Sequence, residues 1–147
     1  MITMTKKEII NCAINTKKYY DEISTSRIFN KKYELTLIFC FAVAIGFQDN
    51  KYESFSKSHP GGLIRTSYIE NKTDIQRFIE AIAIIHEKSL NILTDEKRIF
   101  EIAECYANGG IKKLYAMVCK NVNEADFDKE VESQMNDMMK NLSNTKE

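Results

Sequence analysis

The sequence predicts a mainly α-helical protein: a single-domain orthogonal helical bundle around a buried central helix at about residues 31–46. Residues 35–47 carry no charge, and Thr36 is their only polar side chain. This segment is shorter than the roughly 20 residues that span a bilayer, and a helix that is apolar on all sides must be enclosed by its own domain. The chain also has one proline and five glycines in 147 residues, so breakers are too sparse for a strand-rich fold.

The first half of the chain contains two predicted helices and one irregular stretch. Thr5 and Glu8 form a capping box, which predicts a first helix over about residues 6–15. The central helix is expected to end at Gly46, because a residue without Cβ suits the left-handed position after a helix. Residues 47–69 contain the only proline and a Gly-Gly pair, and their aromatic and branched residues leave room for a short β-hairpin.

Three further helical segments follow. Capping and apolar spacing predict a helix over about residues 73–88 and another that starts after Thr94. We expect the latter to stop at residues 108–110, Asn-Gly-Gly, and a second helix to continue from there as a helical hairpin. The last helix is expected over about residues 126–142. The chain therefore divides into a helical core, residues 1–123, and an acidic C-terminal helix and tail, residues 124–147, packed on the core or used for association.

Composition narrows the function classes. The 21 basic and 21 acidic residues give zero formal charge, which argues against a strongly basic nucleic-acid-binding face but leaves a local patch open. The four cysteines include no CxxC pair and, with only two histidines, offer no zinc-ligand spacing. Lone cysteines fit a reducing compartment, and the N-terminus lacks the apolar run of a secretory signal. We expect a cytoplasmic protein without a cofactor.

The sequence contains no recognisable catalytic signature. His59 lies in a Ser-His-Pro-Gly-Gly loop and is read as loop surface, whereas His86 ends an apolar helix and is read as a packed histidine. Glu101 and Glu104 lie three residues apart on one predicted helix face, and carboxylates on facing helices can hold metal ions. Helical di-iron sites also need Glu-x-x-His motifs, and the chain has none. A metal-dependent nuclease is therefore the least favoured function.

Two surfaces are candidates for binding. The N-terminal third carries basic residues among tyrosines, which could contact phosphates, although a solvated helical face is the simpler interpretation. These candidate nucleic-acid contacts are Lys6, Lys7, Lys17, Lys18, Arg27, Lys31 and Lys32. The last helix carries an apolar stripe that is rich in methionine, which either packs on the domain or forms a partner interface. The residues of this stripe are Phe127, Val131, Met135, Met138, Met139 and Leu142.

Three segments together resemble one protein family. They are FAVAIGFQDNKYESF, GLIRTSYI and EIAECYANGGIKKL, in that order within about residues 31–120. The chain resembles the Dnd system-associated protein 4 family, small accessory proteins found beside bacterial DNA phosphorothioation and phage-defence genes. The ECYANGG string is the most specific part. The motif residues with structural explanations are Arg65, Glu104, Tyr106, Asn108, Gly109 and Gly110.

The resemblance implies an accessory protein of an antiviral DNA-modification locus, and it implies no catalytic residues. We therefore expect a non-enzymatic protein that docks on a larger defence protein or associates with itself. The alternative is a DNA-binding protein that uses the basic N-terminal face. Because Arg65 and Glu104 are the charged residues of two separate motifs, we also hypothesise that they form an ion pair across the fold.

Overall fold

The computed structural model describes residues 7–26, 35–120 and 124–144. In this part of the chain it contains six α-helices, one 3-10 helix and one two-stranded sheet. The elements in chain order are β1 (Ile9–Ile10), α1 (Lys17–Ser24), α2 (Leu35–Gln48), β2 (Ile64–Arg65), α3 (Ser67–Glu70), α4 (Thr73–Glu87), η1 (Leu90–Thr94), α5 (Glu96–Lys120) and α6 (Glu124–Asn144). The predicted mainly α-helical bundle is confirmed.

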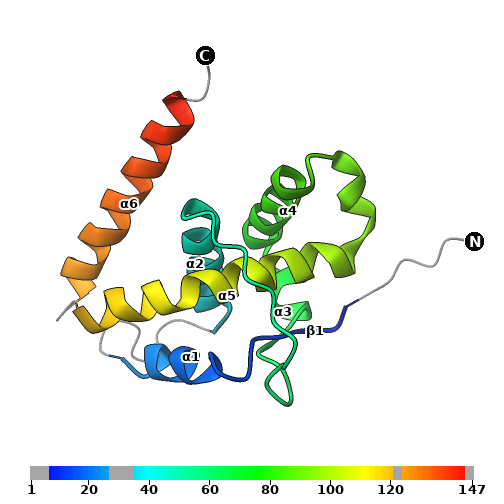
Figure 1. The fold of residues 1–147 in the computed structure, drawn as a ribbon, viewed down its shortest axis with the longest axis horizontal. Coiled ribbons are helices and arrows are strands. Elements are labelled where there is room, and N and C mark those ends of the chain that lie inside the picture. The colour runs from blue at the N-terminus through cyan, green and yellow to red at the C-terminus, as the bar shows by residue number, and fades with distance from the viewer. Residues whose placement is uncertain (1–6, 27–34, 121–123, 145–147) are drawn as a thin grey trace, which may run out of the picture.

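The core forms where α2 crosses α5. In Figure 1, α5 runs across the middle of the molecule, with α2 standing behind it, α4 above it and α1 below it. Ile38, Phe39, Ala42 and Val43 of α2 are fully buried, as the continuous apolar run predicts. The start of α2 cannot be compared with the predicted start near residue 31, since residues 27–34 lie outside the described part of the chain.

The predicted end of the central helix at Gly46 is wrong. Helix α2 continues to Gln48, and the left-handed residue that follows it is Asn50, with φ of 55°. Gly46 serves a different purpose, because a Cβ at this position would overlap the carbonyl oxygen of Tyr106 on α5. The glycine permits close helix packing and does not end the helix.

The predicted helical hairpin at residues 108–110 is also wrong, because α5 is continuous through both glycines. A Cβ on Gly110 would overlap the carbonyl oxygen of Ala42, and a Cβ on Gly109 would overlap that of Lys51. Glycine is unfavourable inside a helix by about 1 kcal/mol relative to alanine. Here that cost is offset by the close approach of the α5 backbone to α2 and to the segment after it.

The predicted first helix over residues 6–15 is wrong as well. This segment forms β1, which pairs antiparallel with β2 so that Ile9 lies opposite Arg65 and Ile10 opposite Ile64. The carbonyl oxygen of Ile10 accepts a hydrogen bond from the Leu63 backbone N–H at 2.8 Å. Residues 47–69 thus contribute one strand whose partner comes from the N-terminal segment, and they do not form a hairpin of their own. The local capping signal is overridden by these long-range backbone bonds.

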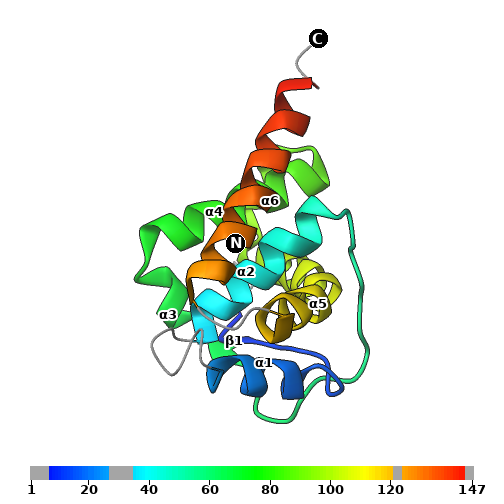
Figure 2. The same ribbon diagram turned by 90° about the vertical axis from the view of Figure 1, so that its left-hand side faces the viewer.

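Two further helices agree with the predicted segments. Helix α4 covers the predicted stretch of residues 73–88, and α6 includes residues 126–142. Figure 2 shows α6 in front of α2, rising beyond the rest of the molecule. Among the described residues, no helix combines the length and apolar character that crossing a membrane requires.

Candidate functional site

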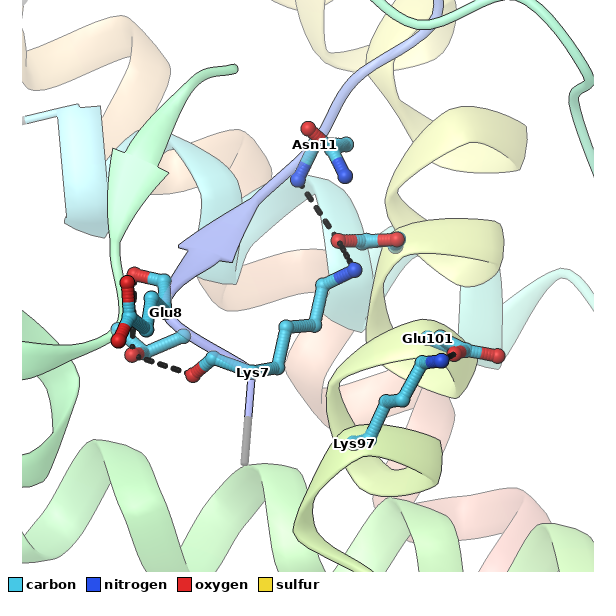
Figure 3. Close-up of polar contacts among 7 residues, drawn as sticks. Lys7, Glu8, Asn11, Lys97 and Glu101 are labelled. Atoms are coloured by element: carbon cyan, nitrogen blue, oxygen red, sulfur yellow. Dashed lines mark hydrogen bonds and ion pairs between the residues drawn. The ribbon is translucent and has the colours of Figure 1, made fainter. Parts of the chain in front are cut away.

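The Glu104 carboxylate on α5 holds the N-terminal segment against the bundle. It is 6% exposed, and its Oε2 lies 3.1 Å from the Lys7 ammonium. The same oxygen accepts a hydrogen bond of 2.7 Å from the backbone N–H of Asn11. Figure 3 shows Lys7 and Asn11 reaching α5 from either end of β1. One buried carboxylate therefore fixes both sides of the short strand.

Burial raises the pKa of Glu104 above its usual value of 4.5, although the Asn11 N–H and the Lys7 ammonium act in the opposite direction. Desolvation disfavours the charged form of a buried carboxyl group, and these two partners compensate for it only in part. The folded state therefore binds the Glu104 proton more tightly than the unfolded state does. The contribution of this proton binding to the free energy of folding is complete below pH 4.5, and it is lost as the pH rises through the raised pKa.

The predicted ion pair between Arg65 and Glu104 is wrong. Glu104 pairs with Lys7, while the Arg65 side chain is exposed. Strand pairing explains the difference: Arg65 lies opposite Ile9 in the sheet, so its backbone is used in the fold and its guanidinium remains outside. Glu104 is the structural residue of the two, as its 6% exposure shows.

The other residues of the ECYANGG string join α5 to its surroundings. The Tyr106 hydroxyl lies 2.8 Å from Nδ1 of His86 on α4. The Tyr52 ring stacks on His86, with ring centroids 4.4 Å apart. The Asn108 side-chain amide donates a hydrogen bond of 3.0 Å to the backbone carbonyl of Glu53. These contacts attach α4 and the segment after α2 to α5, so each has a structural explanation.

Three of the candidate nucleic-acid contacts lie in the described part of the chain. The Lys7 side chain is mostly buried and paired with Glu104, and Lys17 pairs with Asp21 on α1. Lys18 is exposed, and its ammonium lies 5.2 Å from the centroid of the Tyr19 ring. The other four residues lie outside the described residues: Lys6, Arg27, Lys31 and Lys32.

The candidate partner interface on α6 divides into a buried and an exposed part. Phe127 is buried and meets Phe41 of α2 edge to face, with ring centroids 6.2 Å apart. Met135 and Met139 remain 59% and 65% exposed. Val131 is half-buried against the core. The structure does not describe the side chains of the other two residues of the stripe, Met138 and Leu142.

An apolar cavity of about 290 Å³ lies between α6 and the core. Its walls come from α2, α4, α5 and α6, and they include Phe41, Phe78, Leu114, Met135 and Met139. We call this cavity together with the exposed Met135 and Met139 the α6 surface. The apolar stripe is visible in the sequence, but no sequence pattern indicates the cavity, because its walls come from four separate helices.

Two carboxylates of α4 and α5 lie close to basic side chains. Glu101 lies 4.0 Å from Lys97, and Glu87 lies 3.0 Å from Arg98. Within the described ranges, no group of three histidine, cysteine or acidic side chains is placed to hold a metal ion. Burial raises the pKa of Cys40 to about 12, so this thiol stays protonated and unreactive at neutral pH.

Sequence reasoning missed the partners of Glu104 and the residue that stacks on His86. Lys7 and Glu104 lie far apart in the sequence, so no local sequence pattern links them. The aromatic character of Tyr52 was visible, but its position against α4 depends on the path of the chain after α2. Only the tertiary structure brings these pairs together.

The comparisons with known proteins find one match. The family described as DNA sulphur modification system-associated protein 4 matches residues 14–147. This match includes α6 and extends beyond the segments that carried the resemblance. No curated protein and no solved structure matches the chain. Because the family match covers nearly the whole sequence, the chain belongs to the DNA sulphur modification system-associated protein 4 family.

Proposed function

We propose that this chain is a non-enzymatic accessory protein that docks through its α6 surface on a larger protein of the same DNA sulphur modification system. The family description supports the association with such a system. The observation that supports docking is the apolar cavity under α6, which is continuous with two exposed methionines. Methionine side chains are flexible and polarisable, and they adapt to varied partner surfaces.

Charge around the α6 surface indicates the chemistry of the partner. Exposed acidic residues on α6 include Asp128, Glu132 and Asp137, against the basic Lys129 and Lys140. A matching partner would present an apolar segment flanked by Lys or Arg, because complementary charge steers association and selects the partner. Apolar anchors in such a cavity would supply most of the affinity.

Substitutions on the α6 surface test this proposal. Met135→Glu and Met139→Glu place a charge against the apolar partner, and we expect each to weaken binding at least about tenfold, or 1.4 kcal/mol. Binding is measured by calorimetry or by copurification with the coexpressed proteins of the locus. Leu90→Glu is the matched control, because Leu90 is 69% exposed on η1, away from α6.

The results separate docking from its competitors. Unchanged binding by both methionine variants, or equal loss with Leu90→Glu, would refute the proposed surface. A wild-type dimer in light scattering that the methionine variants convert to monomer would identify self-association as the use of the surface, in place of docking on a larger protein.

DNA binding by the basic N-terminal residues is the alternative. Its support in the described residues is limited to α1, where exposed Lys18 lies beside the Tyr19 ring and Lys17 is already paired. Binding of this kind is electrostatic and must weaken steeply with added salt. An affinity for DNA that is insensitive to salt would exclude it.

A further inference from the structure

A second cavity, separate from the α6 surface, adjoins the small sheet. Its volume is about 560 Å³, and it lies among β1, β2, α3, the start of the described part of α2 and the loop before β2. The apolar side chains in its wall are Ile9, Leu35, Leu63, Ile64 and Tyr68. Arg65 is the one charged residue among its described lining residues. The described lining of the cavity therefore combines apolar walls with the Arg65 cation.

The Arg65 guanidinium is available to a ligand. Its side chain is exposed, and among the described residues it takes part in no ion pair or side-chain hydrogen bond. The one intramolecular partner that the sequence suggested, Glu104, is occupied by Lys7. A guanidinium presents a planar fork of N–H groups, which suits a phosphate or carboxylate held by two hydrogen bonds.

Tyr68 adds a stacking group to the same cavity. It lies on α3, three positions beyond the last residue of β2, and it is 56% exposed. Ile9, directly opposite Arg65 in the sheet, is 41% exposed. An exposed tyrosine ring beside a cation is a suitable arrangement for a nucleobase next to its phosphate.

We propose that this cavity binds a phosphorothioate linkage of DNA, with Arg65 donating hydrogen bonds to the non-bridging oxygen, the apolar wall against the larger sulfur and Tyr68 against a neighbouring base. Replacing a non-bridging oxygen by sulfur keeps the single negative charge of the linkage. Sulfur is larger, more polarisable and a weaker hydrogen-bond acceptor than oxygen, so apolar side chains accept it at lower cost. An ordinary phosphate would leave an unsatisfied oxygen against those side chains.

The proposal rests on membership of the family and is independent of docking through α6. The family description supplies the sulfur-modified DNA, and the cavity supplies the mixture of cation, apolar wall and ring. A neighbouring cavity of about 400 Å³ shares Ile9 and Arg65. It is also lined by Lys7, whose ammonium is paired with Glu104, and by the acidic Glu8 and Glu70. Those carboxylates repel a second phosphate, so the DNA strand is directed to the side of Tyr68.

The test compares two otherwise identical short oligonucleotides, one with a single phosphorothioate and one with phosphodiesters only. We expect the full-length protein to bind the phosphorothioate oligonucleotide roughly tenfold more tightly in fluorescence anisotropy. Arg65→Ala and Tyr68→Ala should each remove most of this preference. Arg77→Ala is the control, because Arg77 is an exposed arginine on α4 outside both cavities.

Each outcome decides the proposal. Equal affinity for the two oligonucleotides, no binding of either, or a preference that survives Arg65→Ala would overturn it. Inorganic thiophosphate serves as a third probe, and binding as tight as that of the oligonucleotide would show a site for the free anion, which also overturns the DNA assignment. Unchanged melting temperatures confirm that the variants are folded, and the Met135→Glu protein should keep the preference.

Discussion

At the scale of single residues, the most consequential contact is the one between Lys7 and Glu104. The carboxylate is 6% exposed and the lysine side chain 13% exposed, so the pair is largely removed from water. Removing one partner of a buried ion pair leaves an uncompensated charge, which costs far more than replacing both partners by neutral groups. Substituting one residue of the pair should therefore lower stability more than substituting both residues by neutral ones.

We predict that Lys7→Met lowers the free energy of unfolding by about 2–3 kcal/mol at pH 7, more than Glu104→Gln does. The methionine leaves the ionised carboxylate buried, whereas the glutamine can still accept the Asn11 N–H. Because Glu104 already has a raised pKa, lowering the pH protonates it, and the deficit of Lys7→Met should shrink toward pH 4. Urea unfolding at several pH values measures this.

The double variant Lys7→Met with Glu104→Gln provides the control for the pair. It should be more stable than Lys7→Met alone at pH 7, because no buried charge remains. If the deficit of Lys7→Met were the same at pH 4 and pH 7, the lysine would act through packing alone and not through the carboxylate.

At the scale of secondary-structure elements, the glycines of α2 and α5 decide how closely the two helices approach. Gly46 lies against the Tyr106 carbonyl and Gly110 against the Ala42 carbonyl, so each helix has a glycine in contact with the backbone of the other. These positions are helical and need no special φ. The requirement is for space.

Gly110→Ala should lower the free energy of unfolding by about 3 kcal/mol, even though alanine favours helix formation by about 1 kcal/mol. The added methyl group meets a rigid backbone carbonyl and forces the helices apart. Gly61→Ala is the matched comparison, because it meets nothing within 4 Å and is affected only by its φ of 85°. Thermal and urea unfolding report both effects.

A Gly110→Ala protein as stable as the wild type, or more stable, would contradict the explanation that Gly110 is required for close packing of α5 on α2. In that case the gain in helix propensity would exceed any cost of contact with α2. The Gly61 variant should lose only about 1 kcal/mol, the cost of placing alanine in a left-handed conformation.

At the scale of the whole molecule, the described side chains by which α6 packs on the core include the buried Phe127 and the half-buried Val131. Helix α6 follows the part of the chain that encloses α2, and Figure 2 shows its far end extending beyond the other helices. The predicted division near residue 123, a helical core followed by α6, can be tested by removing α6.

We predict that a truncated protein ending at Lys120 keeps a cooperative unfolding transition and loses about 3 kcal/mol of stability, the value of burying one phenylalanine side chain and part of a valine. Circular dichroism should show the loss of α6 alone. The truncated protein should also lose binding at the α6 surface, and it should keep the binding preference assigned to Arg65. A truncated chain without cooperative unfolding would instead make α6 part of the core.

The amount that could be predicted from sequence differs between the fold and the sites. Helices α2, α4 and α6 were predicted because apolar spacing is local and depends only on neighbouring residues. The end of α2 and the continuity of α5 were predicted wrongly, because the glycines were read as local helix breakers. Their effect depends on the backbone of another helix, which no local pattern shows.

The sequence by itself determined the helical class, the buried central helix, the apolar stripe of α6 and the motifs by which the family is recognised. These depend on composition and on spacing within single segments. Only the tertiary structure decided that Glu104 pairs with Lys7, that Arg65 faces a cavity and that the glycines lie between crossing helices. Each of these contacts joins segments far apart in the chain, and it forms because burial of α2 brings them together.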